Sequence, residues 1–156
     1  MKPTVYIETT VPSYYYDERA TLAVDIERTR TWWDRERADY ECFISPVVLD
    51  ELSAGHYRAQ SQCLSLVESL PLLSVADEVL EIAEAYRARR LMPMDPAADA
   101  LHLALASYYR VDYLLTWNCR HLANANKMKH LEILNTKMGL SIPAVVTPHM
   151  LWPKEV

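Results

Sequence analysis

The chain of 156 residues is 51% hydrophobic and carries a formal net charge of −5 at pH 7, with a pI near 5.5. Its length predicts one globular domain, and its acidic balance argues against a protein that holds duplex DNA by phosphate neutralisation alone. The three cysteines include no CxxC pair, so neither a disulfide framework nor a zinc site is expected.

The sequence also lacks two kinds of feature, glycine-rich nucleotide-binding motifs and long apolar segments. Only Gly55 and Gly139 are present, which excludes a GxGxxG fingerprint and a GxxxxGK[ST] loop, and with them the nucleotide cofactors bound by those motifs. The first apolar run follows Met1 to Pro3 directly, and no stretch holds 18 uncharged apolar residues. We therefore expect neither a signal peptide nor a membrane span, and a cytoplasmic protein.

Short apolar runs bounded by turn signals alternate with longer segments of helical periodicity. Strands are expected at residues 4–7, 42–45, 72–75, 113–116 and 144–146. Helical periodicity is clearest over residues 21–38, 56–70, 78–91, 96–110 and 121–139, the last ending at a glycine cap. This alternation predicts an α/β fold with a central parallel sheet of about five strands, whose functional site lies at the carboxyl edge.

Glu8 interrupts the apolar pattern of "TVYIETT" directly after the first expected strand. At that place a carboxylate can face a site at the sheet edge. Taken alone, it is also typical of a helix cap or of a surface acid.

Glu51 belongs to "SPVVLDELSAG", in which Ser45 and Pro46 are typical of a helix start and Gly55 of its end. At about 100° per residue, Glu51 falls within the apolar arc of that helix, whereas Asp50 points to water. The alternative is an ordinary acid tolerated on the flank of a short helix.

Asp99 is the only acid inside "PAADALHLALASYY", a helix that Asp95 and Pro96 are expected to start. Burying a lone carboxylate is costly, and a metal ion would neutralise it more completely than the helix N-terminus, which is the alternative. His102, one turn on, is interpreted as a packing histidine rather than a ligand.

Asn118 follows the strand expected at residues 113–116. It could bind a metal only through its neutral carbonyl oxygen, and the alternative is an ordinary helix N-cap. All four of these polar residues project from one predicted edge. Three carboxylates gathered there would raise their pKa values or recruit a hard cation, Mg²⁺ or Mn²⁺.

The stretches "YIETT", "SPVVLDEL", "DALHLALA" and "DYLLTWNCRHLANA" resemble, in order and spacing, the PIN-domain family, and within it the VapC-type toxin ribonucleases of type II toxin–antitoxin systems. The resemblance covers nearly the whole chain. It implies a single three-layer PIN-like domain over residues 1–156. It also implies an endoribonuclease that hydrolyses RNA phosphodiester bonds with Mg²⁺ or Mn²⁺ and is bound by a cognate antitoxin.

The same resemblance assigns the residues of the site. The family's acidic quartet, which binds one or two divalent cations and activates water, falls on Glu8, Glu51, Asp99 and Asn118. Aspartate is usual at the first and fourth positions, so this chain has a longer arm at one and one charge fewer at the other. Candidates for orienting water or phosphate are Thr9, Thr10, Thr116 and Arg120, the last two having a structural or solvated role as the alternative.

Two groups of side chains are candidates for contacts with other molecules. Aromatic residues in the N-terminal helices are explained by core packing, a homodimer surface or an antitoxin groove: Tyr14, Tyr15, Tyr16, Trp32 and Trp33. Basic residues are candidate RNA contacts, or simply solvated helix faces: Arg87, Arg89, Arg90, Lys127 and Lys129.

Two rival hypotheses remain beside the ribonuclease. A PIN-like RNA-binding or scaffold protein would keep the fold and lose the chemistry, because Asn118 is neutral. A phosphoacceptor domain similar to response regulators also gathers acids at this edge. It needs an aspartate at the end of a central strand and a paired lysine, and the sequence offers neither.

Overall fold

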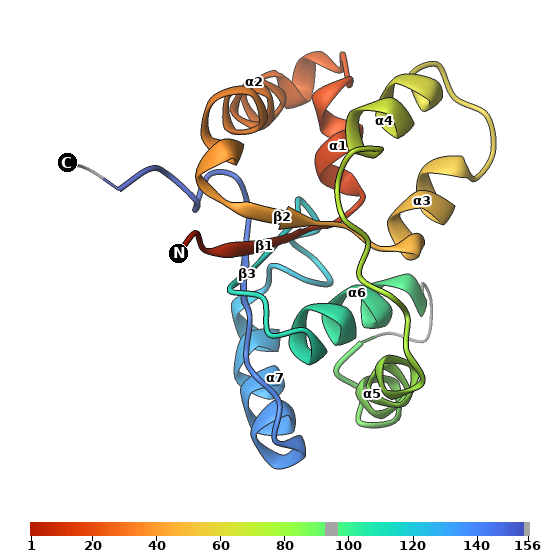
Figure 1. Ribbon diagram of the computed structural model, residues 1–156, viewed down its shortest axis with the longest axis vertical. Helices are drawn as coiled ribbons and strands as arrows, with labels where there is room; N and C mark the ends of the chain where they lie inside the picture. The colour runs from red at the N-terminus through yellow and green to blue at the C-terminus, as the bar shows by residue number, and fades with distance from the viewer. Residues whose placement is uncertain (93–96, 155–156) are drawn as a thin grey trace.

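The computed structural model describes residues 1–92 and 97–154, and in them a parallel sheet lies between two groups of helices (Figure 1). Its four strands are β1 (Thr4–Ile7), β2 (Glu41–Phe43), β3 (Tyr113–Leu115) and β4 (Ala144–Val146), in the order β2-β1-β3-β4. Every pairing is parallel, and β1 and β3 occupy the centre. The expected parallel α/β architecture is confirmed.

Seven α-helices surround this sheet in the described residues. Their bounds are α1 (Thr10–Tyr15), α2 (Ala23–Thr31), α3 (Pro46–Ser53), α4 (Gln60–Val67), α5 (Asp77–Ala88), α6 (Ala97–Tyr108) and α7 (Ala125–Met138). In Figure 1, α1, α2 and α4 lie above the sheet, and α5, α6 and α7 lie below it, which makes three layers. Within the described part of the chain, no helix is long and apolar enough to cross a membrane.

The expected strand at residues 72–75 is wrong. Leu72 forms only an isolated bridge with Ile44, through hydrogen bonds from the Ile44 N–H to the Pro71 carbonyl and from the Leu73 N–H to the Ile44 carbonyl. The neighbouring chain turns away at Ser45 to begin α3, so this segment has no further backbone to pair with. The sheet therefore has four strands in the described residues rather than five.

Several helix bounds also differ from expectation. The periodic segment 21–38 is α2 followed by a π-helical turn (Trp32–Glu36) and a 3₁₀ turn (Arg37–Asp39). Helix α4 begins at residue 60 rather than 56, and α7 begins at residue 125 rather than 121. Gly139 ends α7 at φ 70°, the left-handed conformation expected of a glycine cap. The expected start of α6 at Asp95 and Pro96 lies outside the described residues.

The N-terminal aromatic residues divide between core and site. Trp32 and Trp33 are buried, so core packing explains both. Tyr14, on α1, stacks on Trp117 with 5.3 Å between ring centroids. That stack ties α1 to the segment after β3, one residue before Asn118. The three cysteines are free thiols, as expected.

Ser45 fixes the start of α3 and, with it, the phase of the helix. Its Oγ accepts a hydrogen bond from the Val47 N–H at 3.2 Å, and Pro46 occupies the first helical position. The same Oγ lies 2.7 Å from the Tyr6 hydroxyl of β1. Asp50 is exposed and Glu51 half-buried, which confirms the expected phase.

Replacing Ser45 by alanine is expected to destabilise the fold by about 1–2 kcal/mol, because the N-cap and the partner of a buried hydroxyl are lost together. Urea unfolding followed by circular dichroism measures the change. Ser53→Ala, at the exposed end of the same helix, is the control and should change stability by less than about 0.5 kcal/mol. Equal effects of the two changes would contradict the cap.

Candidate metal centre

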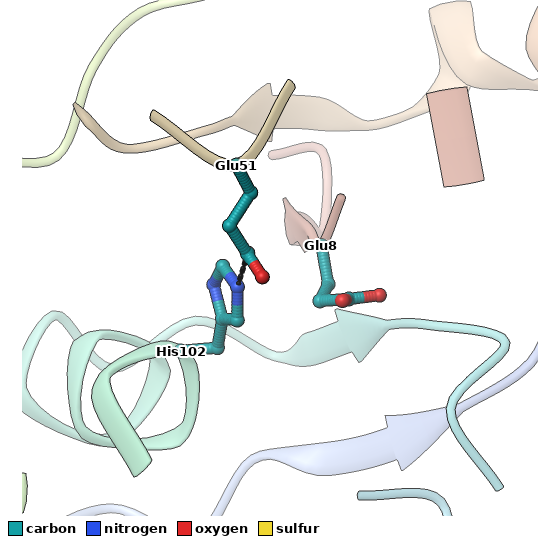
Figure 2. Close-up of side chains that lie close together, drawn as sticks. All are labelled: Glu8, Glu51 and His102. Atoms are coloured by element: carbon teal, nitrogen blue, oxygen red, sulfur yellow. Dashed lines mark hydrogen bonds and ion pairs between the residues drawn. The ribbon is translucent and has the colours of Figure 1, made fainter. Parts of the chain in front are cut away.

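Four sequence-predicted polar residues lie at the carboxyl edge of the sheet. Glu8 is the first residue after β1, Glu51 lies in the second turn of α3, and Asp99 lies in the first turn of α6. Asn118 follows β3 by three residues. Figure 2 shows two of these side chains, Glu8 and Glu51, converging with His102 of α6.

Glu8 is almost completely buried, and hydroxyl and amide donors hold its carboxylate. Its Oε1 accepts hydrogen bonds from the Thr10 N–H at 3.0 Å, from the Thr10 hydroxyl, and from the Thr116 hydroxyl at 2.8 Å. Burial raises the pKa of Glu8, and the electrostatic influence of His102 and these hydrogen bonds offset only part of that rise. Thr10 and Thr116 therefore act as donors that orient Glu8.

Glu51 is held from two sides. Its Oε1 accepts a hydrogen bond from the Thr9 hydroxyl at 2.6 Å and lies 2.5 Å from His102 Nε2. Burial would raise the pKa of Glu51, but the hydrogen bond from His102 and its electrostatic influence, together with the Thr9 hydroxyl, hold the pKa below its ordinary value. Of the three carboxylates of the site, Glu51 is the one whose pKa lies below its ordinary value.

One ligand atom each from Glu8, Glu51 and His102 lies within 4.8 Å of the other two, a spacing at which one cation could touch all three. His102 is fully buried, and its second nitrogen, Nδ1, lies 2.7 Å from the Tyr6 hydroxyl. Both ring nitrogens therefore have protein partners, as expected for a packing histidine.

Asp99 and Asn118 form a second pair beside this cluster. The Asn118 Nδ2 donates to Asp99 Oδ1 at 3.3 Å, whereas the buried Asp99 Oδ2 has no hydrogen-bond partner among the described residues. Burial raises the pKa of Asp99, a rise that the electrostatic influence of His102 and His121 opposes and the charge of Glu51 reinforces. Asp99 lies one helical turn before His102 on α6, and so beside the first cluster, although it is not one of its three members.

The backbone around Asn118 forms a tight turn. The Asn118 Oδ1 accepts the His121 N–H at 3.0 Å, and the Asn118 N–H donates to the Thr116 hydroxyl at 2.9 Å. The N-cap of α7 is instead Asn124, whose side chain accepts from the Asn126 N–H. Asn118 therefore caps a turn and holds Asp99 at the same time.

A basic hollow of about 710 Å³ lies next to this second pair. It is lined by Arg87, Ala88, Arg90, Met92, Arg120, His121 and Lys127. His121 joins the hollow to the site, because its backbone N–H donates to Asn118 Oδ1 and its electrostatic influence opposes the rise in the pKa of Asp99. Arg120 is thus in the hollow and exposed, while Arg89 and Lys129 are exposed outside it.

Three partners of the site were not expected from the sequence: the Tyr6 hydroxyl, the Ser45 hydroxyl and the Nε2 of His102. Each is fully buried and bonded to a residue more than 35 positions away. The available signal was the position of His102 three residues after Asp99, which puts both on one face of α6. Nothing in the pattern of β1 distinguishes Tyr6 from an ordinary core residue.

No protein-family model and no curated protein sequence matches the chain. Among solved structures, it is similar to a chain of VapBC2 from Rickettsia felis, crystallised bound to a DNA fragment from their promoter. The similarity covers 96% of this chain and 99% of that chain, with a TM-score of 0.55 and 14% sequence identity. The chain therefore shares its fold with that chain, and the expected PIN-like fold is confirmed.

The donor set of the site fits a hard divalent cation. Its carboxylate and amide groups supply the oxygen ligands that Mg²⁺ and Mn²⁺ prefer. The buried Asp99 Oδ2, left without a protein partner in the described residues, is the atom that most needs a cation. A cation would also offset the cost of keeping Glu8 and Asp99 ionised in a buried site.

Proposed function

We propose that this protein is a metal-dependent endoribonuclease, the toxin of a type II toxin–antitoxin module. The observation that carries the proposal is the buried Asp99 Oδ2 without a partner in the described residues, beside two further carboxylates at the edge of a PIN-like sheet. A surface acid would be solvated, and a purely structural buried acid would be hydrogen-bonded through both oxygens.

The cation would be held by Glu8, Glu51, Asp99 and the carbonyl oxygen of Asn118. When bound, Mg²⁺ or Mn²⁺ lowers the pKa of water and offsets the charge that develops on the phosphate during hydrolysis. Thr10 and Thr116 hold Glu8 in place through its Oε1. The Thr9 hydroxyl does the same for Glu51.

The RNA would reach this site over the basic hollow. Arg90, Arg120 and Lys127 line the hollow, and together they provide positive charge in a chain whose net charge is −5. Such local charge suits contacts to phosphates that flank the scissile bond. Arg120 is therefore proposed to bind phosphate. The hydroxyls of Thr9, Thr10 and Thr116 instead donate hydrogen bonds to the Glu51 and Glu8 carboxylates.

An antitoxin and a second copy of the chain are the proposed protein partners. The VapBC2 structure from Rickettsia felis is a complex on promoter DNA, and the present chain has the fold of one of its chains. We propose a cognate antitoxin for this chain and a homodimer of the toxin. The module is proposed to act in the cytoplasm, where its RNA substrate would be available.

Cleavage of a structured RNA by the purified chain tests the proposal. We expect cleavage with Mn²⁺ or Mg²⁺, none with EDTA, and recovery when excess cation is added back. Cleavage that persists in EDTA would contradict metal dependence. Absence of cleavage, together with RNA binding, would favour the second candidate function.

That second candidate is a PIN-like RNA-binding or scaffold protein without catalysis. One observation favours it: the Asn118 amide donates to Asp99 Oδ1 and so satisfies one oxygen that a cation would otherwise contact. In such a protein, the amide substitutes for part of the positive charge of the metal. The two candidates differ in whether a divalent cation binds.

Asn118→Asp is expected to tighten Mn²⁺ binding about tenfold, or about 1.4 kcal/mol, because a neutral ligand becomes an anion. Without metal, the variant should be less stable than wild type, since the amide bond to Asp99 is replaced by two facing carboxylates. Isothermal titration with Mn²⁺ measures the affinity, and thermal melts with EDTA or Mn²⁺ measure stability.

Asn124→Asp is the matched control, because the Asn124 side chain caps α7 and bonds to the Asn126 N–H and the Arg120 carbonyl rather than to Asp99. It should leave the affinity for Mn²⁺ unchanged. An unchanged affinity in Asn118→Asp would place Asn118 outside the ligand set. Cleavage gained by Asn118→Asp in an otherwise inactive protein would identify the wild type as the non-catalytic form.

A further inference from the structure

A continuous chain of buried hydrogen bonds runs from β1 to Glu51. The Ser45 Oγ lies 2.7 Å from the Tyr6 hydroxyl, that hydroxyl lies 2.7 Å from His102 Nδ1, and His102 Nε2 lies 2.5 Å from Glu51 Oε1. Ser45, Tyr6 and His102 are all fully buried. This series of hydrogen bonds links the central strand β1 to the N-cap of α3, to α6 and to Glu51 on α3.

With a neutral His102 ring, only one direction of these hydrogen bonds gives the protons of Ser45, Tyr6 and His102 an acceptor each. The Ser45 Oγ already accepts the Val47 N–H, so its own proton is free to go to the Tyr6 oxygen. The Tyr6 proton then goes to His102 Nδ1, which leaves the His102 proton on Nε2, donated to the Glu51 carboxylate. In the reverse direction the Ser45 proton would have no acceptor among these four residues, and His102 Nε2 would face the Glu51 carboxylate without a proton.

His102 is therefore poorly placed to be a metal ligand. Binding a cation through Nε2 would break the bond to Glu51, and binding through Nδ1 would leave the buried Tyr6 hydroxyl without its acceptor. Each nitrogen therefore keeps its hydrogen bond to a protein side chain: Nδ1 to Tyr6 and Nε2 to Glu51. The His102 ring holds Glu51 through Oε1, and the other carboxylate oxygen, Oε2, is left to contact a cation.

We propose that His102 is a positioning residue, held by Tyr6 and Ser45, which donates Nε2–H to Glu51 and fixes that carboxylate for the cation without binding the cation itself. The proposal rests on the proposed metal site and adds to it a buried residue that orients one ligand. Partners of this kind typically change metal affinity by about 10- to 100-fold when removed.

Nitrogen NMR of the metal-free protein tests the bond itself. Histidine labelled with ¹⁵N gives separate signals for Nδ1 and Nε2, and the signals missing from His102→Gln identify His102 among the five histidines. A proton on Nε2 supports the proposal. A bare Nε2 overturns it, because such a nitrogen cannot donate to Glu51.

Titration with Mn²⁺ tests the consequence for the metal. His102→Leu removes the donor and should weaken Mn²⁺ binding about tenfold, whereas His102→Gln keeps an amide N–H near the position of Nε2 and should bind within about threefold of wild type. His56→Gln, in an exposed loop, is the control and should match wild type. Wild-type affinity in His102→Leu overturns the proposal.

Electron spin echo spectroscopy of bound Mn²⁺ separates positioning from ligation. The coupling of a directly bound imidazole nitrogen, present in wild type and lost in His102→Gln, would make His102 a ligand and overturn the proposal. Its absence from wild type supports positioning, and so does its persistence in the variant. If wild type binds no Mn²⁺, the proposed function fails, and the NMR result still decides whether His102 holds Glu51.

Discussion

Asp99→Asn is expected to reduce RNA cleavage by about a thousandfold or more, equivalent to about 4 kcal/mol of activation free energy, while the fold becomes more stable. The side chain is almost completely buried and its Oδ2 has no partner in the described residues. Asparagine keeps the shape and the oxygen that accepts from Asn118, and it removes the charge that would hold the cation. Activity and stability should therefore move in opposite directions.

The gain in stability should depend on pH. Burial raises the pKa of Asp99, so the wild type is penalised when the carboxylate is charged, above its folded pKa. That penalty falls away as pH drops through the folded pKa toward the ordinary value of about 4. In EDTA we expect the variant to melt about 2–4 °C higher at neutral pH, for about 1 kcal/mol, and to converge on wild type in acid.

Asp77→Asn is the matched control for Asp99. Asp77 is an exposed acid in the first turn of α5, as Asp99 is in the first turn of α6. Its loss should leave cleavage unchanged and cost about 0.3–1 kcal/mol, because a favourable interaction with the helix N-terminus disappears. If Asp99→Asn behaves in the same way, the acid of α6 stabilises its helix and is not a metal ligand.

The sheet could be predicted because its signals are local. Residues 4–7 and 144–146 are apolar runs that became β1 and β4 with the expected bounds. Residues 72–75 carry the same signal and failed, because a strand also needs a neighbour of matching length, and β2 ends where Ser45 begins α3. That second requirement depends on the path of another segment, about 30 residues away in the chain.

The gathering of the candidate residues at one edge could be predicted, but not the hydrogen bonds between them. Topology alone brings Glu8, Glu51, Asp99 and Asn118 to one edge, since parallel strands end together. Which oxygens face one another depends on rotamers and on buried partners. The bond between His102 and Glu51 joins side chains 51 positions apart, and no periodicity within α6 or α3 indicates it.

The orientation of the side chains on α3 could be predicted from local signals alone. Ser45 and Pro46 defined the helix start, and from that start the exposed position of Asp50 and the inward position of Glu51 followed. The start of α7 was predicted wrongly because the sequence offers two asparagines, Asn118 and Asn124, that could each serve as the N-cap. Asn118 caps a turn through the His121 N–H, and Asn124 caps the helix.

That phase makes a pair of adjacent substitutions a sharp test of the site. Glu51→Gln is expected to reduce cleavage by about a thousandfold and to weaken Mn²⁺ binding by at least about tenfold, whereas Asp50→Asn should change either by less than about twofold. Glutamine retains an oxygen that accepts from Thr9 and His102, so the fold should remain intact, and only the negative charge is lost.

The two variants have to be compared under the same conditions, with cleavage rates at saturating Mn²⁺ and affinities by isothermal titration. At saturating metal, a residual defect in Glu51→Gln measures what the charge contributes to the reaction beyond holding the cation. Because Asp50 is exposed and one residue away, it reproduces the change in net charge and in local sequence. Equal losses in both variants would mean that long-range charge, rather than a carboxylate directed into the site by the α3 cap at Ser45, controls the activity.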